Sequence, residues 1–337
     1  MDLQTETMLC GVCVDVGRFE VQERPLPQVA PEGWVLVDLA AAGLCGTDYH
    51  IFEGKHPYLE YPRVIGHELS GFVAQTAHGF TAGQVVVVNP YISCGECRAC
   101  LRGKPNCCVA IGVLGVHRDG GMCARIAVPA GNLYDAQGLS PRHAALVEFL
   151  AIGAHAVRRS DMAAGDRVLV VGAGPIGLGA ALFARMTGAE VHVMDLSPER
   201  LAAARRLGFT HLHGAAAVLP EDGFDVVMDA TGNPRAMEAG FGRVAHGGTY
   251  VLVSVVKDDL SFNDAEFHKR EMRLIGSRNA LAEDFAHVIK ALKFGDISGD
   301  ALISTVLPLA DLPQRIGELA ADRGGIIKAI VSLREGA

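Results

Sequence analysis

A cysteine, a histidine and a carboxylate stand in one glycine-rich stretch of the chain, residues 43–71, GLCGTDYHIFEGKHPYLEYPRVIGHELSG. Cys45 precedes His67 by 22 residues, and Glu68 follows the histidine directly. A thiolate, an imidazole and a carboxylate brought together by the fold would bind zinc and leave a coordination position for water or substrate. We therefore predict a metal site that does chemistry. The competing interpretation is a buried thiol, a core imidazole and a surface acid.

A second group of cysteines has a shorter and more regular spacing, in CGECRACLRGKPNCC. The spacing C-x2-C-x2-C-x7-C is formed by Cys94, Cys97, Cys100 and Cys108. Four thiolates on one lobe predict a closed tetrahedral zinc site that holds a loop and does no catalysis. An iron–sulfur cluster has a related spacing, and the spacing also allows Cys107 as the fourth ligand.

A glycine-rich turn follows an apolar run in RVLVVGAGPIGLGAALFARMTG. The residues of the turn are Gly172, Gly174, Pro175, Ile176 and Gly177. Residues 167–171 predict the strand before the turn, and a helix is expected from residue 178. This strand–turn–helix context is typical of dinucleotide binding, in which the glycines let the backbone approach a pyrophosphate at the helix N-terminus. The alternative is a glycine-rich turn in a flavodoxin-like domain.

The next apolar strand, EVHVMD, ends on Asp195, 18 residues after Gly177. An acid at this position accepts hydrogen bonds from the adenosine ribose and repels a 2′-phosphate, which favours NAD over NADP. Arg200 weakens this inference, since it could offset the charge, stack on adenine or face solvent. Thr231 and Val253 lie at the expected ends of the following strands, where we expect the rest of the cofactor.

The order of the elements predicts an α/β fold with two domains. Residues 1–150 alternate short apolar runs with Gly and Pro and predict a mostly β domain. Residues 151–285 alternate buried strands with helices, which predicts a doubly wound parallel sheet that binds NAD. Residues 286–337 end in a strand-like run, KAIVSLREGA, and we expect this segment to complete the first domain.

Composition limits the partners. The net charge is −8 and no run of Lys and Arg exists, so nothing indicates nucleic-acid binding. The apolar runs are too short to span a bilayer, and the N-terminus MDLQTETMLCGVC does not have the pattern of a signal peptide. We expect a cytoplasmic protein that acts on a small molecule. Nine cysteines in such a chain indicate metal ligands or buried thiols rather than disulfides.

The motifs GLCGTDYH, GHELSG, the four-cysteine lobe, VLVVGAGPIG and DATG resemble, in this order, the zinc-dependent medium-chain dehydrogenase/reductase family. The match covers nearly the whole chain and is similar to the polyol and sugar-acid branch. YPRVIGHELSG, GKPNC and LGVHRDGG resemble the RspB-like starvation-sensing subgroup. The resemblance implies a GroES-like catalytic domain beside a Rossmann domain, an NAD-linked enzyme with two zinc ions per chain, and a dimer or tetramer.

The resemblance also implies residue roles at the first metal site. Cys45 and His67 match the constant zinc ligands, and Glu68 matches a direct or alternating ligand. Glu148 matches the remaining position, which is a cysteine in liver-type alcohol dehydrogenases and a glutamate in the polyol branch. Asp48 matches the acid that orients the histidine ligand. Which of the two glutamates binds zinc directly stays open.

The implied reaction is hydride transfer from a carbinol carbon to NAD, with zinc lowering the pKa of the substrate hydroxyl. Thr47 matches the residue that touches the substrate oxygen, and His50 matches the distal proton acceptor. A sugar acid would also need a cation, for which Arg118 and Arg278 are candidates. Lys55 is a further candidate, although it fits a solvated surface charge better than the two arginines do. His56 is either a pocket residue or plain surface.

Three alternatives compete with a polyol or sugar-acid dehydrogenase. A zinc-dependent NADP alcohol or aldehyde reductase conflicts with Asp195. L-threonine 3-dehydrogenase shares most of the motifs. An NAD-binding zinc sensor without enzymatic activity would not need the proton relay of Thr47 and His50.

Overall fold

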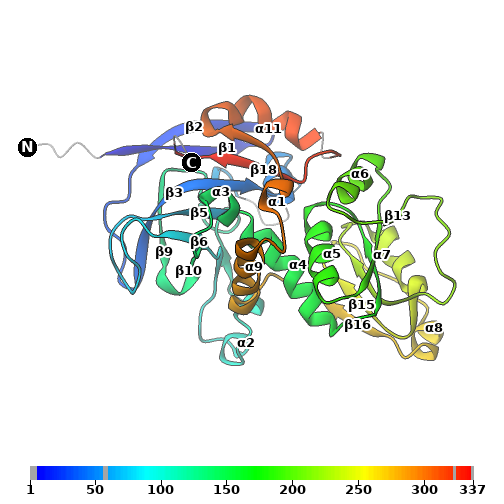
Figure 1. Cartoon of the computed structure of the whole chain (residues 1–337). Coiled ribbons are helices and arrows are strands. Elements are labelled where there is room, and N and C mark those ends of the chain that lie inside the picture. Colours follow the sequence, from blue (N-terminus) through cyan, green and yellow to red (C-terminus); the bar gives the residue numbers. More distant parts are fainter. Residues whose placement is uncertain (1–5, 56–59, 322–323, 335–337) are drawn as a thin grey trace, which may run out of the picture. The chain divides into compact units, whose positions relative to one another are not determined.

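The computed structural model describes residues 6–55, 60–321 and 324–334. The chain divides into two compact units. The first comprises Met1–Glu148 and Ile289–Ala337, and the second comprises Phe149–Val288. Figure 1 shows that strands make up most of the first unit, whereas strands and helices alternate in the second. The predicted combination of a mostly β domain with a parallel-sheet domain is confirmed.

The largest sheet of the first unit has the strand order β10-β6-β5-β3-β18-β17, and β9 also pairs with β3. Its strands are β3 (Trp34–Leu44), β5 (Glu68–Val73), β6 (Val85–Val88), β9 (Arg125–Pro129), β10 (Leu133–Asp135), β17 (Ile303–Pro308) and β18 (Lys328–Ser332). A second sheet has the order β2-β1-β4, and β7 pairs with β8. These strands are β1 (Thr7–Asp15), β2 (Arg18–Pro25), β4 (Arg63–Val64), β7 (Tyr91–Ile92) and β8 (Gly112–Val113).

Strand β3 joins segments that are distant in the sequence. Gly43 is the register partner of Glu68 in β5 and of Ile330 in β18, both antiparallel. Most of β3 is buried, so its residues WVLVDLAAAGL form an almost continuous apolar run rather than an alternating one. The C-terminal strand therefore lies beside the segment that leads to Cys45.

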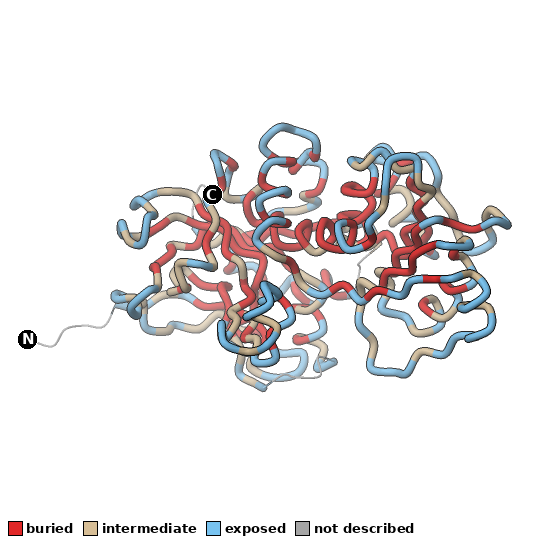
Figure 2. Tube along the Cα trace, turned by 90° about the horizontal axis from the view of Figure 1, so that it is seen from below, coloured by how far each residue is buried: buried red, intermediate tan, exposed pale blue. Residues whose placement is uncertain are grey.

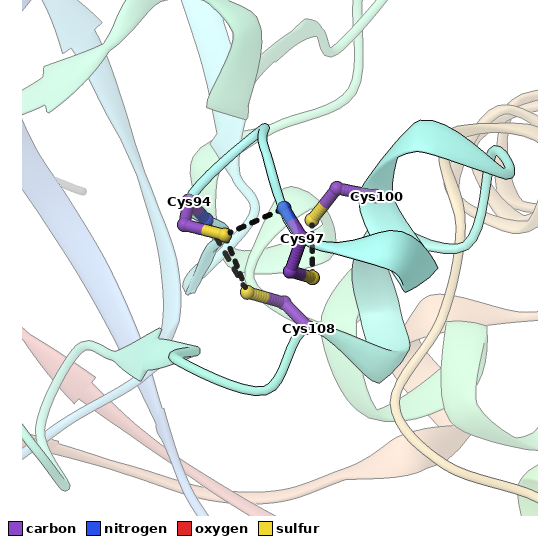
Figure 3. Close-up of side chains that lie close together, drawn as sticks. All are labelled: Cys94, Cys97, Cys100 and Cys108. Atoms are coloured by element: carbon purple, nitrogen blue, oxygen red, sulfur yellow. Dashed lines mark hydrogen bonds between the residues drawn. The ribbon is translucent and has the colours of Figure 1, made fainter.

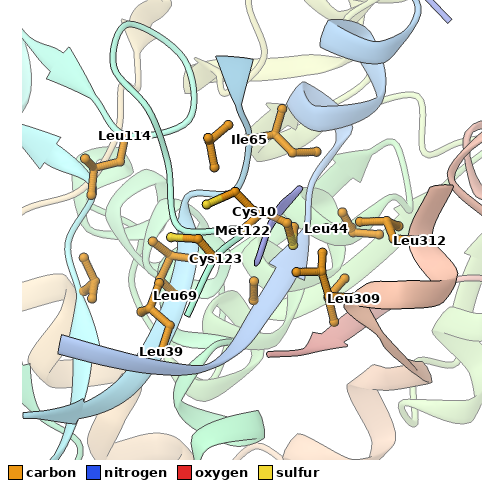
Figure 4. Packing of buried hydrophobic residues seen from close by; sticks show 14 of the residues in the cluster. Cys10, Leu39, Leu44, Ile65, Leu69, Leu114, Met122, Cys123, Leu309 and Leu312 are labelled. Atoms are coloured by element: carbon orange, nitrogen blue, oxygen red, sulfur yellow. The ribbon is translucent and has the colours of Figure 1, made fainter. Parts of the chain in front are cut away.

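The core of the first unit fills the space enclosed by these strands (Figure 4). Leu39, Leu69 and Met122 from the sheets and loops are at most 1% exposed. Helix α11 (Leu312–Ala321) adds Leu312 and Ile316 to the same cluster. Burial of one such leucine contributes about 1.5–3 kcal/mol, so the many aliphatic contacts make this core the main source of stability in the unit.

The second unit contains a parallel sheet with the order β13-β12-β11-β14-β15-β16. Its strands are β11 (Arg167–Val171), β12 (Glu190–Met194), β13 (His211–His213), β14 (Phe224–Asp229), β15 (Val244–Leu252) and β16 (Arg273–Gly276). The chain starts in the middle at β11, runs outward to β13 and returns to β14. The order thus reverses between β11 and β14, which is where open α/β sheets bind their ligands.

Helices connect these strands. Those of the alternating region are α4 (Val147–Ser160), α5 (Pro175–Met186), α6 (Pro198–Arg206), α7 (Pro234–Gly240), α8 (Asp264–Lys269) and α9 (Ala282–Phe294). The other α-helices, besides α11, are α1 (Gly46–Phe52), α2 (Arg98–Leu101), α3 (Pro141–Ala144) and α10 (Gly299–Leu302). Figure 2 shows that the buried residues gather in the interior of the trace of each unit, while most exposed residues lie on its outer turns. Within the described ranges, no helix is long and apolar enough to cross a membrane.

A buried acid links two helices of the second unit. Asp284 is 2% exposed and accepts hydrogen bonds from Arg158 Nε (2.8 Å) and from the backbone N–H of Leu281 (2.8 Å). Its Oδ2 also lies 2.7 Å from Nδ1 of His155. Burial raises the pKa of Asp284, but the hydrogen bonds from His155 and Arg158 outweigh it and lower the pKa to about 2.

We expect Asp284→Asn to lower the free energy of unfolding by about 2 kcal/mol at pH 7, because each pKa unit corresponds to about 1.4 kcal/mol. The folded-state pKa is depressed, so the contribution is present above about pH 4, the pKa of an unfolded aspartate, and is lost as the pH falls through about 2. Urea unfolding at a series of pH values measures this. Asp300→Asn, at an exposed partner of His143, is the control. Equal losses in the two variants at pH 7 would contradict the assignment.

Candidate active site

Asp48 holds the two segments that carry the predicted metal ligands. Cys45 is the N-cap of α1, with extended backbone angles (φ −109°, ψ 160°). The buried Asp48 carboxylate accepts hydrogen bonds from Cys45 N (2.9 Å) and from Gly66 N (3.1 Å). Its Oδ1 also lies 3.7 Å from Nδ1 of His67. One carboxylate thus fixes the backbone at Cys45 and beside His67.

Cys45, His67 and Glu68 come together as the sequence predicts. Their ligand atoms lie within 4.8 Å of one another, and His67 and Glu68 are buried. Burial lowers the pKa of His67, but Asp48 and Cys45 raise it by more, and the net shift is well upward. The surroundings of the imidazole therefore favour positive charge, which suits a cation site.

Lys328 is a site residue that the sequence analysis missed. Its Nζ donates to Glu68 Oε1 (2.6 Å) and to the Leu44 carbonyl (3.0 Å), and its side chain is 1% exposed. A Cβ on Gly43 would lie 2.1 Å from Glu68 Oε2, so only glycine leaves room for this carboxylate. The available signal was a lysine at the start of the apolar run KAIVS, since an unpaired lysine is rarely buried.

Glu148 lies at the start of α4 and is 2% exposed. The Tyr91 hydroxyl donates a hydrogen bond to its Oε1. Burial, the largest effect, raises the pKa of Glu148 to about 7; the charge of His67 acts against this shift, and that of Glu68 adds to it. Glu148 does not belong to the three-residue group defined by the 4.8 Å separation. Tyr91, also missed from the sequence, is its hydrogen-bonding partner.

The polar atoms of this site fit a bound metal. Among the described residues, the buried side-chain atoms without a hydrogen-bond partner include His67 Nδ1, Glu68 Oε2 and Glu148 Oε2. A buried polar atom left unpaired costs about 1–3 kcal/mol. Two of these atoms are carboxylate oxygens, whose lone pairs a cation can accept. The sulfur, nitrogen and oxygen donors together suit zinc.

The four-cysteine lobe also fits a metal, as Figure 3 shows with its four thiols turned toward one another. The sulfurs of Cys94, Cys97, Cys100 and Cys108 lie within 4.8 Å of one another. Two sulfur pairs are 3.5 Å apart, near the roughly 3.8 Å edge of a tetrahedron with Zn–S bonds of about 2.3 Å. Cys107 is exposed and lies outside this group. Backbone N–H groups donate to the sulfurs of Cys94 and Cys108.

The glycine turn of the second unit makes room for a phosphate group. Gly172 has a φ of +97°, which L side chains rarely adopt. A Cβ on Gly177 would lie 1.8 Å from the Gly172 carbonyl oxygen, so the turn closes only with glycine there. Gly174 is the N-cap of α5, and a Cβ at this position would meet nothing within 4 Å. The helix N-terminus is therefore open to an anion.

Asp195 is tied to this turn. Its Oδ2 accepts a hydrogen bond from Ala173 N (2.7 Å) and its Oδ1 from Ser197 N (2.8 Å). Arg200 Nη1 lies 3.5 Å from Oδ2. The arginine therefore pairs with the acid, and the carboxylate is held at the end of β12, beside the glycine turn.

The predicted proton-relay residues and the remaining predicted cofactor residues lie on α1 and at the ends of β14 and β15. Thr47 is half-buried and His50 is exposed, both on α1. Thr231 donates through its hydroxyl to Asp229 Oδ1 (2.7 Å), and Val253 N donates to the Asp229 carbonyl (2.9 Å). Asp229 thus orders both loops at the ends of β14 and β15.

Lys55, Arg118 and Arg278, the candidate substrate cations, are exposed. Lys55 forms an ion pair with Glu53 (3.1 Å), which fits the surface interpretation. Arg118 covers Gly112, where a Cβ would lie 2.6 Å from its Nε. Arg278 follows β16 in the second unit. His56 lies outside the described residues.

Two family models match the chain. Residues 31–138 match the alcohol dehydrogenase GroES-like domain, and residues 175–293 match the zinc-binding dehydrogenase model. The first match contains Cys45, His67, Glu68 and the four-cysteine lobe, and the second contains residues 175–177 of the glycine turn and Asp195. Both matches agree with the one family that the motifs resemble, the zinc-dependent medium-chain dehydrogenases/reductases.

Known proteins are similar over the whole length. L-galactonate-5-dehydrogenase of Escherichia coli K12 is 40% identical over 97% of this chain and 99% of its own. The crystal structure of the alcohol dehydrogenase rspB of E. coli CFT073 with NADH has a TM-score of 0.90 at 28% identity, covering 97% and 99%. A zinc-binding dehydrogenase of Sinorhizobium meliloti 1021 bound to NADP has a TM-score of 0.88 at 28% identity, with the same coverage.

These similarities confirm the predicted enzyme class, together with the zinc and the nicotinamide dinucleotide that the class uses. The chain belongs to the zinc-dependent medium-chain alcohol dehydrogenase family.

Proposed function

We propose that the protein is an NAD-linked dehydrogenase that interconverts a secondary alcohol of a sugar acid or polyol and the corresponding ketone. The observation that carries this proposal is the convergence of Cys45, His67 and Glu68, because the histidine and the glutamate are buried and each has an unpaired donor atom that suits a catalytic zinc. The similarity to L-galactonate-5-dehydrogenase supports a sugar acid as the substrate class. L-threonine is the competing substrate.

The residues of the site would have separate roles in binding the metal and in moving the proton. Cys45 and His67 would hold zinc, with Glu68 or Glu148 as the oxygen ligand. Bound zinc supplies a Lewis acid that lowers the pKa of the substrate hydroxyl. Thr47 would accept the hydroxyl proton and pass it toward His50. These two residues are three positions apart on α1, so they lie on the same side of the helix.

The acid at the end of β12 supports NAD over NADP. A ribose with free hydroxyls can donate hydrogen bonds to Asp195, whereas a 2′-phosphate would be repelled by it. Arg200 lies 3.5 Å away and offsets part of this charge. The preference for NAD therefore rests on the part of the Asp195 charge that Arg200 does not offset, since this part repels the 2′-phosphate of NADP.

Turnover tests the function directly. Zinc-loaded protein with NAD is expected to form NADH, seen by absorbance, with a galactonate-type sugar acid or a polyol, and faster than with L-threonine. Cys45→Ser should lower kcat by at least about a thousandfold, because the metal loses a ligand and its geometry. It should also remove one of two zinc ions.

Cys107→Ser is the matched control, since this thiol is exposed and outside the four-cysteine group. It should keep both ions and full activity. No turnover with any substrate by protein that holds both zinc ions would refute the proposal for these substrate classes.

Asp195→Ser tests the cofactor preference. Removing the carboxylate is expected to lower kcat/KM for NAD and raise it for NADP, changing their ratio by about 10–100-fold, the equivalent of about 1.5–3 kcal/mol for a charged hydrogen bond. Glu199→Gln, an exposed neighbour, should leave the ratio unchanged. Equal use of NAD and NADP by the unaltered protein would contradict the preference.

Lys328→Met tests the buried pair. Removing one partner leaves the Glu68 charge uncompensated, which costs about 3–5 kcal/mol of unfolding free energy. Adding Glu68→Gln should recover most of the lost free energy of unfolding, because the uncompensated Glu68 charge is then removed as well. The double variant should remain inactive. Urea unfolding and zinc content are the measurements. Lys55→Met, at an exposed pair with Glu53, should change stability by less than about 1 kcal/mol; an equal loss there would contradict this account.

A further inference from the structure

Three histidines and a glutamate lie together in the second unit, outside the catalytic machinery. Glu190 and His192 are on β12, and His211 and His213 are on β13, the strand at one end of the sheet order. Figure 1 labels β13 near α6. In the parallel register, His192 is the partner of His211, and Met194 is the partner of His213. Because side chains alternate along a strand, all four point to one face of the sheet.

The rings of this cluster are stacked. His192 is stacked on His211, with a centroid distance of 4.5 Å, and on His213, with a centroid distance of 5.1 Å. Its Nδ1 lies 2.8 Å from His213 Nε2, and its Nε2 lies 2.8 Å from Glu190 Oε1. Glu190, His192 and His211 each offer a ligand atom within 4.8 Å of the others. His192 is buried, whereas Glu190 and His211 are exposed.

These donors have the chemistry of a metal site. A neutral imidazole has one N–H and one lone pair. If Nδ1–H of His192 donates to His213, Nε2 keeps its lone pair, 2.8 Å from Glu190 Oε1. A cation about 2.0–2.2 Å from each atom, to one side of the line that joins them, would bind both. A ligating histidine usually makes such a hydrogen bond through its other nitrogen. The exposed ligands give an ion a path from solvent.

We propose that Glu190, His192 and His211 form a third metal site, with His213 as the residue that orients His192. Two imidazoles and one carboxylate favour a divalent transition ion such as Zn²⁺, Co²⁺ or Ni²⁺ over Mg²⁺ or Ca²⁺. The site has no thiolate, so it differs from both other metal sites of the chain. Asp195 N donates to the His213 carbonyl (3.1 Å), so the site adjoins the strand end that carries the cofactor acid.

The metal-free alternative is a hydrogen-bonded chain in which His213 donates to His192 and His192 donates to Glu190. Protein that holds zinc at the catalytic site and at the four-cysteine lobe is titrated with Co²⁺. Binding is followed by calorimetry and visible absorbance. We expect one further ion per chain, with the bands of a nitrogen–oxygen site and no thiolate charge transfer. The zinc content should stay at two ions per chain.

Variants locate the ion. Glu190→Gln and His211→Gln, both at exposed positions, should each weaken its binding at least about tenfold, and His213→Gln should weaken it by about tenfold through loss of orientation. His246→Gln, at an exposed histidine of β15, is the matched control and should bind Co²⁺ as the unaltered protein does. Unfolding midpoints without added ion show whether each variant is folded.

Several results would overturn the proposal. One is the absence of a third ion. Another is unchanged affinity in both Glu190→Gln and His211→Gln, and a third is equal weakening in His246→Gln. Thiolate charge transfer accompanied by release of zinc would show exchange at the cysteine sites instead. Since activity is not the readout, failure here is distinct from failure of the proposed dehydrogenase function.

Discussion

The buried ion pair between Glu68 and Lys328 is the constraint on which the arrangement of the candidate active site depends. Neither charge is stable alone in the interior, so β5 and β18 must meet with the carboxylate opposite the ammonium. Strand β3 lies between them, and Gly43 supplies the space in which the carboxylate lies. Because β3 leads directly into Cys45, the register that pairs these charges also places the thiol near His67.

The charge balance of the same site explains why it suits a divalent ion. When all groups are ionised, the acids outnumber the bases, with Asp48, Glu68, Glu148 and Cys45 opposing His67 and Lys328. A surplus of negative charge in a buried site is unfavourable, and burial, with the charge of Glu68 adding to it, raises the pKa of Glu148 to about 7. A cation would offset this surplus and satisfy the unpaired carboxylate oxygens. A bound cation would thus both stabilise these buried residues and supply the metal that the reaction needs.

In the second unit, strand β12 contributes residues to two different sites. Its carboxyl end leads to Asp195, whose carboxylate accepts a hydrogen bond from the backbone N–H of Ala173 in the glycine turn. This is the place where parallel sheets bind ligands, at the carboxyl ends of the strands. Its earlier residues, Glu190 and His192, carry the histidine cluster. Alternation along the strand points His192 away from its neighbours Val191 and Val193, which are buried. A short strand can therefore contribute to two separate sites.

The sequence alone determined the features that depend on local spacing. The four-cysteine lobe and the turn from Gly172 to Gly177 form within short segments, where chain geometry leaves few alternatives. The alternation of strands and helices likewise indicated the parallel sheet. The metal site of Cys45, His67 and Glu68 was predicted from the residue types, and the resemblance of the motifs added Glu148 to it.

Only the tertiary structure decided which distant groups meet. Lys328 lies 260 residues from Glu68, and Tyr91 pairs with Glu148 across 57 residues. The choice of Cys108 over Cys107 needed the direction of each side chain, and the approach of His192 to His211 needed the register of two strands. Such contacts depend on strand register and burial, which single-residue spacing does not specify, because a shift of one residue turns every side chain to the opposite face.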